Sequence, residues 1–167
     1  WVGVIPCEYR RELPLETTLA IGEYLHLRTS DIQVGVLNVP VGDLPARRAV
    51  EEKKLDFVVF GDAEPAIESF VKRVSEPPRG VLWRRHGLLE EDFAAPLVNW
   101  EKLPIPAWDL FDHQSYRPSA HRYKKWPVLP VFASRACPYG CDFCPQSLFN
   151  PSQKHSIRPP QKVVEEI

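Results

Sequence analysis

The sequence predicts an α/β fold that begins with a partial Rossmann-like domain built on a parallel sheet. Up to about residue 75, short continuous apolar runs alternate with longer stretches of helical pattern. Continuous apolar runs are typical of parallel strands that are buried on both faces. Alternation of strand and helix along a chain favours a parallel sheet with helices packed on both faces.

The elements of this first domain, residues 1–75, can be assigned in order. Strands are expected at residues 2–5, 32–37 and 57–60, and helices at 15–27, 46–54 and from 64 onward. Asp62 is suited to cap the last helix, with Glu64 and Pro65 in its first turn. The core face of that helix is expected to consist of apolar residues at three-four spacing, namely Ile67, Phe70, Val71 and Val74.

A proline-rich connector is expected at residues 76–126. Residues 80–87 predict one arm of a small hairpin, with a turn at His86 and Gly87. Residues 117–126 are basic with interleaved aromatic side chains, a composition that can bind single-stranded nucleic acid. Because the net charge of the chain is only -1, we expect a solvated loop there and no nucleic-acid partner.

Three cysteines lie in one short run, at Cys137, Cys141 and Cys144. A helix would also place them on one face, but Pro138 disfavours helical backbone at the residue before it. Gly140 permits the strained backbone with which a loop curls around a ligand. We therefore expect a loop in which the three thiols converge.

Three thiolates from one loop suit a cuboidal iron–sulfur cluster that keeps one iron open. Zinc usually takes four ligands, often as two separated pairs, and no fourth cysteine lies near this run. An open iron is a place where a small molecule can bind and receive an electron. The apolar run at residues 131–133 predicts a buried strand that leads into the loop.

The residues around the cysteines resemble the signature of the radical S-adenosylmethionine (radical SAM) enzymes. Residues 133–136, Ala-Ser-Arg-Ala, precede a Cys-x3-Cys-x2-Cys run, and Phe143 stands between its last two cysteines as in that pattern. Residues 157–167 are similar to the start of the first barrel helix in that family. One departure is Ala136, where many members of the family carry glycine.

The resemblance implies that residues 127–167 begin a truncated radical SAM (βα) partial TIM barrel. Cys137, Cys141 and Cys144 would each ligate one iron of a [4Fe–4S] cluster, and the fourth iron would chelate S-adenosylmethionine. Phe143 would flank the cluster, with its backbone at the adenine edge. The implied activity is reductive cleavage of S-adenosylmethionine to a 5′-deoxyadenosyl radical, with an external electron donor and an unknown, small-molecule or other, substrate.

Two further phrases resemble parts of the same family. Residues 103–107, Leu-Pro-Ile-Pro-Ala, are similar to its linker. Residues 55–64 resemble the close of the cobalamin-binding-type domain that precedes many radical SAM barrels, with matches at Gly61 and Glu64 and departures at Asp62 and Ala63. The cobalt-ligating Asp-x-His-x-x-Gly motif is absent from this chain, so cobalamin is a candidate cofactor with no residue to name. An equal alternative is that this domain binds no cofactor and has only a structural role in packing against and positioning the rest of the protein.

The second class of function that the residues allow is a non-catalytic module in which the loop holds zinc or an electron-transfer cluster. Structural zinc would need Cys7 or a histidine as its fourth ligand. A disulfide would leave the other thiols unpaired, and nothing marks the chain as secreted. Cys7 itself follows a predicted strand and is expected to be a small core residue. Glu165 and Glu166 are expected on the surface of the last helix.

The composition fits a soluble globular protein, since 44% of the 167 residues are hydrophobic and 26% are charged. No apolar run is long enough to span a membrane, and the clustered cysteines fit a reducing cytoplasm. The chain contains no methionine, opens on a strand and stops inside a helix. We therefore expect a fragment of a longer enzyme, inactive on its own because its substrate pocket is missing.

Overall fold

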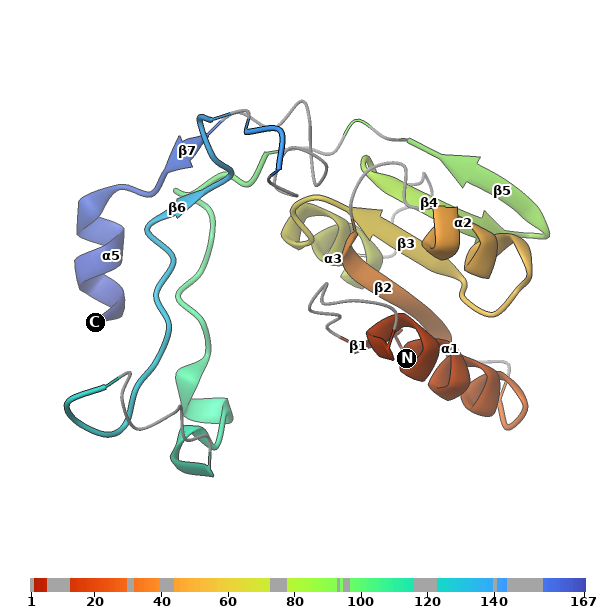
Figure 1. The fold of residues 1–167 in the computed structure, drawn as a ribbon, viewed down its shortest axis with the longest axis horizontal. Coiled ribbons are helices and arrows are strands. Elements are labelled where there is room, and N and C mark those ends of the chain that lie inside the picture. The colour runs from red at the N-terminus through yellow and green to blue at the C-terminus, as the bar shows by residue number, and fades with distance from the viewer. Residues whose placement is uncertain are drawn as a thin grey trace. The chain divides into compact units, whose positions relative to one another are not determined.

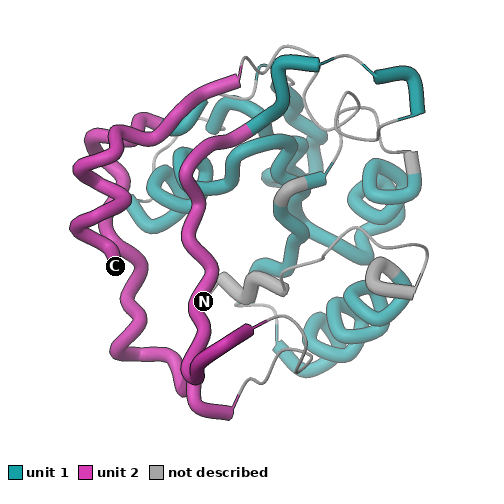
Figure 2. Tube along the Cα trace, turned by 60° about the vertical axis from the view of Figure 1, so that its left-hand side comes forward, with its two compact units in different colours: residues 1–98, 136–154 teal, residues 99–135, 155–167 magenta. Residues whose placement is uncertain are grey.

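A computed structural model describes residues 2–5, 13–29, 32–39, 44–72, 78–92, 94, 97–115, 123–139, 141–143 and 155–167. The chain divides into two compact units, which Figure 2 shows in different colours. Unit 1 comprises residues 1–98 and 136–154, and unit 2 comprises residues 99–135 and 155–167. Each unit is described by itself.

Unit 1 is built on a five-stranded mixed sheet with the order β1-β2-β3-β4-β5 (Figure 1). The strands are β1 (Val2–Ile5), β2 (Gln33–Val39), β3 (Phe57–Phe60), β4 (Val81–Arg85) and β5 (Leu88–Glu91). The first three strands are parallel, and β4 and β5 add an antiparallel edge. The three expected strands are confirmed, and the sheet is compatible with a Rossmann-like domain. The sheet also continues past residue 75, because the predicted hairpin of the connector forms its last two strands.

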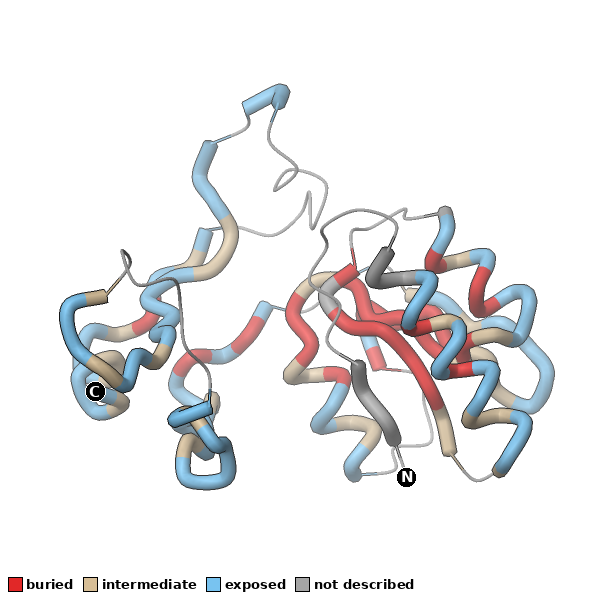
Figure 3. The backbone as a smooth tube through the Cα atoms, turned by 60° about the horizontal axis from the view of Figure 1, so that its bottom comes forward, coloured by how far each residue is buried: buried red, intermediate tan, exposed pale blue. Residues whose placement is uncertain are grey.

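Three helices cover the two faces of this sheet: α1 (Leu13–His26), α2 (Leu44–Glu51) and α3 (Glu64–Val71). One core cluster joins Val34, Val36 and Val58 of the strands to Ala46 and Val50 of α2, with α1 packed against it. A second cluster on the opposite face places strand residues against α3; its members are Leu37, Phe57, Val59, Ala63, Ala66, Val81 and Trp83, with Phe70 packed beside them. Figure 3 shows that the buried residues gather in these strands and the helix faces over them. Helices therefore lie on both faces, as the alternating pattern predicts.

Gly35 sets the spacing between the two central parallel strands. It is paired with Phe57 of β3, and a Cβ atom built on Gly35 would lie 2.5 Å from the ring and the carbonyl oxygen of Phe57. Phe57 is fully buried, and the centroid of its ring lies 4.7 Å from that of Phe70, with the two ring planes tilted by 44°. Only a residue without a side chain fits between these groups.

The hairpin between β4 and β5 turns at the residues that the sequence predicts. Arg85 pairs with Leu88, which leaves His86 and Gly87 as a two-residue loop. Both have positive φ, 48° and 82°, the signature of the type I′ turn that suits the twist of a hairpin. Arg84 of β4 reaches across to α2, where its guanidinium donates to the carbonyl oxygens of Val50 and Glu51. These bonds satisfy carbonyl groups at the C-terminal end of that helix.

An ion pair also fixes the hairpin to α2. The guanidinium of Arg47 lies 2.6 Å from the carboxylate of Glu91 and 2.9 Å from that of Glu51. Hydrogen bonds to Glu91 and then to Glu51 raise the pKa of Arg47 above its ordinary value. The two carboxylates thus favour the charged form of the guanidinium.

Two details of α3 correct the sequence-based expectation. Ala63, not Asp62, occupies the N-cap position, and a carboxylate oxygen of Asp62 accepts a hydrogen bond of 3.2 Å from the backbone N–H of Val98. The helix buries Ala66 and packs Phe70 against the core, whereas Val71 is 77% exposed. The predicted core face was therefore wrong at Val71 and also at Ile67, which is 36% exposed, whereas Phe70 packs against the core as predicted and Ala66 is the residue that the helix buries. Val74 lies outside the described residues.

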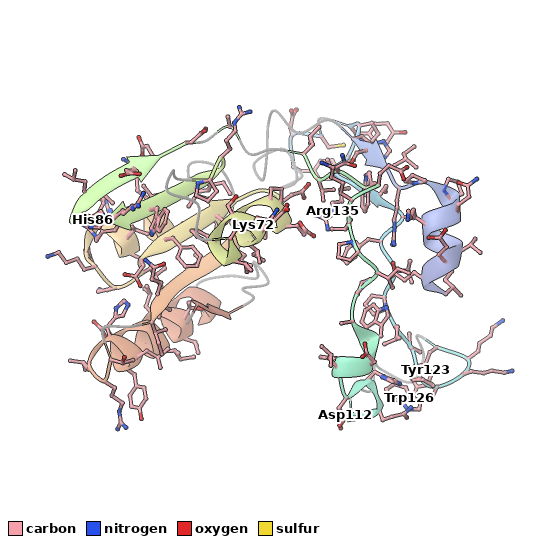
Figure 4. The ribbon with its side chains drawn as sticks, turned by 180° about the vertical axis from the view of Figure 1, so that it is seen from behind. Lys72, His86, Asp112, Tyr123, Trp126 and Arg135 are labelled. Atoms are coloured by element: carbon pink, nitrogen blue, oxygen red, sulfur yellow. The ribbon has the colours of Figure 1, made fainter. Side chains whose placement is uncertain are left out.

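The described residues of unit 2 contain little regular structure. They form two short 3-10 helices, η1 (Trp108–Leu110) and η2 (His113–Ser115), the strands β6 (Ser134–Arg135) and β7 (Ser156–Ile157), and the helix α5 (Pro160–Glu166). At one end of the unit lie Asp112, Tyr123 and Trp126 (Figure 4), where the indole N–H of Trp126 donates to Gln114 over 2.9 Å. Within the described parts of the chain, no helix is long and apolar enough to cross a membrane.

Residues 131–133 are not the buried strand that their apolar pattern predicts. The strand begins only at Ser134, and Val131 and Phe132 are 37% and 64% exposed. The partner of this strand is β7, which runs antiparallel to it. A short apolar run does not by itself distinguish a buried strand from an exposed one, so this expectation was wrong. The helix expected near the end of the chain is confirmed as α5.

Candidate metal centre

The cysteine run lies in the segment that connects β6 to β7, and these two strands hold the ends of that segment together. Ser134 pairs with Ile157 and Arg135 with Ser156, so the two strands that flank residues 136–155 are paired with each other. The backbone N–H of Arg158 extends the pairing with a hydrogen bond of 2.9 Å to the carbonyl oxygen of Ala133. Cys137 is thus two residues from the closed base of the loop.

Trp100, from the connector, touches both strands at this base. Its indole N–H donates to the hydroxyl of Ser156 on β7 over 3.2 Å. The guanidinium of Arg135 on β6, labelled in Figure 4, lies 5.3 Å from the centroid of the Trp100 ring, within the range of a cation–π contact. Trp100 is 8% exposed, and its two partners are half-buried. Sequence reasoning missed this residue, because its partners lie 35 and 56 positions away and no periodic pattern marks it.

A buried ion pair joins the base of the loop to α5. The guanidinium of Arg158 donates to the carboxylate of Glu166, and the two side chains are only 4% and 2% exposed. The same guanidinium group lies 3.4 Å from the carbonyl oxygen of Phe132. Its Nε is buried and has no hydrogen-bond partner among the described residues. The expectation that Glu166 lies on the helix surface was therefore wrong: the end of the helix turns this carboxylate inward, onto a buried cation.

The structure places two of the three predicted ligands. Cys137 and Cys141 are exposed, and neither forms a disulfide. The described residues around them, 136–139 and 141–143, are not helical, which confirms the prediction of a loop. Cys144, Gly140 and Cys7 lie outside the described residues. Among the described residues, no three His, Cys, Asp or Glu side chains gather into a group that could hold a metal. The convergence of all three thiols therefore stays a prediction.

Ala136, directly before the first cysteine, adopts left-handed backbone with φ = 57°. L-amino acids with a Cβ atom rarely adopt this conformation, whereas glycine adopts it without steric cost. This is the position at which the chain departs from the radical SAM pattern by carrying alanine. The backbone that a glycine would favour is thus present here, with a side chain that strains it.

Phe143 is 90% exposed. An aromatic side chain that is fully open to water contributes nothing to packing in this structure. It is free to contact a ligand beside the cysteines. The donor set of the loop, soft thiols that are accessible and not oxidised to disulfides, fits an iron–sulfur cluster or another thiophilic metal.

The chain is similar to two curated proteins. One is Uncharacterized methyltransferase PH0819 of Pyrococcus horikoshii, which is 29% identical over 121 residues that cover 68% of this chain and 25% of that protein. The other is Anaerobic magnesium-protoporphyrin IX monomethyl ester cyclase of Synechocystis, 27% identical over 122 residues that cover 70% of this chain and 23% of that protein. The chain thus spans about a quarter of the length of these relatives. No family model matches the sequence, and no solved structure matches the chain.

Both relatives carry the names of enzymes, one of a methyltransferase and one of a cyclase. The similarity therefore supports an enzyme family at a coarse level.

Proposed function

We propose that this chain carries the cluster loop of a radical SAM enzyme, preceded by an α/β domain of the cobalamin-binding type. The observation that carries the proposal is the loop at residues 136–155. Its two described cysteines are exposed, non-helical and free of disulfides, and its ends are held by β6 and β7. Accessible thiols in a segment whose flanking strands are paired support a ligand-binding loop.

In this proposal Cys137, Cys141 and Cys144 supply one thiolate each to a [4Fe–4S] cluster. Exposure leaves the described thiols accessible to an incoming metal. Phe143, which is exposed beside the cysteines, would flank the cluster and would limit the access of water to it. When bound, the cluster would supply an electron to S-adenosylmethionine and so release a 5′-deoxyadenosyl radical.

The reaction class is taken from the relatives. Their names favour methyl transfer or ring closure on an organic substrate, and we propose one of these for the complete enzyme. An external electron donor is required, because none of the protein side chains can supply a low-potential electron. A cluster held by thiolates is best preserved in a reducing compartment, so we place the protein in the cytoplasm. Cobalamin is a candidate second cofactor of the α/β domain.

Anaerobic reconstitution with iron and sulfide tests the proposal. The chain is expected to bind about four iron and four sulfide ions, with the broad visible absorption of an iron–sulfur cluster. Cys137→Ala, Cys141→Ala and Cys144→Ala should each abolish stable loading. Cys7→Ala is the matched control, and it should load like the unsubstituted chain because we place it outside the site.

Two results would contradict the proposal. One is tight binding of a single zinc ion with no uptake of iron, which would support a non-catalytic metal module instead. The other is iron loading that survives all three loop substitutions, since the cluster would then be held elsewhere in the chain.

A further inference from the structure

We propose that Trp100 is a positioning residue for the cysteine loop, acting from a connector that the sequence signature of the loop does not include. The inference rests on the proposed function, because it assigns Trp100 a role in holding the cluster site. It goes beyond that function because Trp100 lies 37 residues before Cys137, the first cysteine of the site.

The argument starts from the weakness of the base itself. The pairing of β6 with β7 involves two residues on each strand, extended by the single bond from Arg158 to Ala133. An isolated two-stranded ribbon is marginally stable in water even when it is longer than this. Closing the loop at residues 136–155 also costs chain entropy, and that cost opposes the pairing. Further contacts are therefore needed to keep the two ends of the loop together.

Trp100 provides a contact to each end. Its ring faces the guanidinium of Arg135, the last residue of β6, and its indole N–H binds the hydroxyl of Ser156, the first residue of β7. Arg135 and Ser156 are themselves paired across the ladder. The side chain of Trp100 thus bridges Arg135 and Ser156, the last pair of the ladder before the loop begins. Trp100 itself is buried, and hydrogen bonds and cation–π contacts are stronger away from water.

This position matters for the cysteines because of their distance along the chain. Only Ala136 separates Arg135 from Cys137. The first thiol is therefore joined to the end of β6 through one residue, whose backbone is left-handed with φ = 57°. We infer that loss of the Trp100 contacts changes the geometry at Cys137, and not only the stability of unit 2.

The test compares conservative variants in the full 167-residue chain. Trp100→Phe keeps an aromatic ring for Arg135 but removes the N–H donor, and Ser156→Ala removes the acceptor of the same bond. If the bond acts as proposed, each variant has the same effect and the double variant adds little to either. Trp126→Phe is the matched control, since Trp126 makes a similar indole hydrogen bond to Gln114 at the other end of unit 2.

Two measurements are made on each variant. The first is hydrogen exchange of the backbone amide of Arg158 in the metal-free chain, which reports opening of the ladder. The second, on the chain loaded with iron and sulfide, is the rate of cluster loss to a chelator together with the paramagnetic resonance spectrum of the reduced cluster. Loss of one hydrogen bond predicts exchange and cluster loss that are each about five-fold faster for Trp100→Phe and Ser156→Ala, with an altered spectrum. Trp126→Phe should match the unsubstituted chain.

The results separate three cases. Faster exchange with an unchanged spectrum and unchanged cluster loss overturns the inference, because Trp100 would then be structural only. Unchanged exchange overturns it as well. If the unsubstituted chain takes up no iron, the proposed function fails, and exchange alone decides whether Trp100 holds the ends of the loop: a five-fold increase supports that role and no increase refutes it.

Discussion

The buried pair of Arg158 and Glu166 provides the sharpest prediction about how α5 is held to the base of the loop. Their side chains are 4% and 2% exposed, so Glu166→Gln leaves the guanidinium of Arg158 almost fully buried without its counter-ion. Removing one partner of a buried ion pair costs roughly 3–5 kcal/mol. The double variant Arg158→Met with Glu166→Leu removes both charges and is expected to lie within about 1 kcal/mol of the unsubstituted chain, because apolar replacements often match such pairs.

The assay is hydrogen exchange followed by mass spectrometry on peptides that cover residues 155–167, which reports α5 independently of unit 1. A cost of about 3 kcal/mol corresponds to exchange that is on the order of a hundred-fold faster. Glu165→Gln is the matched control on the adjacent residue, because its partner Lys162 lies at 3.4 Å and both side chains are substantially exposed. It should change exchange less than about two-fold. The reasoning is refuted if Glu166→Gln behaves like Glu165→Gln, or if the double variant is as damaged as the single one.

Three further predictions concern stability. Gly35→Ala should lower the free energy of unfolding of unit 1 by about 1–3 kcal/mol in urea titrations, because the new methyl group would meet Phe57 at 2.5 Å; an unchanged midpoint would contradict this. Ala136→Gly should stabilise the loop by about 0.5 kcal/mol, since relief of the left-handed strain is partly offset by greater freedom in the unfolded chain. A loss of stability would show that the strain argument is wrong. Arg84→Met should cost about 1–2 kcal/mol by freeing carbonyl groups at the end of α2, seen as faster exchange there, and protection equal to that of the unsubstituted chain would rule this out.

The fold of unit 1 could largely be predicted from the sequence, because its signals are local. Continuous apolar runs become β1, β2 and β3, and the turn at His86 and Gly87 forms where glycine permits positive φ. The prediction fails where packing decides. Val71 fits the helical period but is exposed, because α3 rests on Ala66 and Phe70 instead. The hairpin joins the main sheet, which no local pattern in the connector indicates.

The candidate site divides in the same way. The three cysteines and the loop that carries them follow from residue type, proline and glycine within one short segment. The residues that hold the base of that loop could not be predicted in this way, because they make contacts between distant parts of the chain. Trp100 meets Ser156 across 56 positions, and Glu166 turns inward onto Arg158 although its neighbour Glu165 is exposed. Such contacts can be located only when the tertiary structure is known.

The central claim is that the cysteine loop holds a cluster with one iron open to S-adenosylmethionine. The measurement that tests it most directly is paramagnetic resonance of the anaerobically reconstituted and reduced chain, recorded with and without S-adenosylmethionine. We expect the g-values of the cluster to shift when the nucleoside is added, and the signal to be lost in Cys141→Ala. A cluster signal that S-adenosylmethionine leaves unchanged, in a chain whose unit 1 is shown to be folded, would contradict the account.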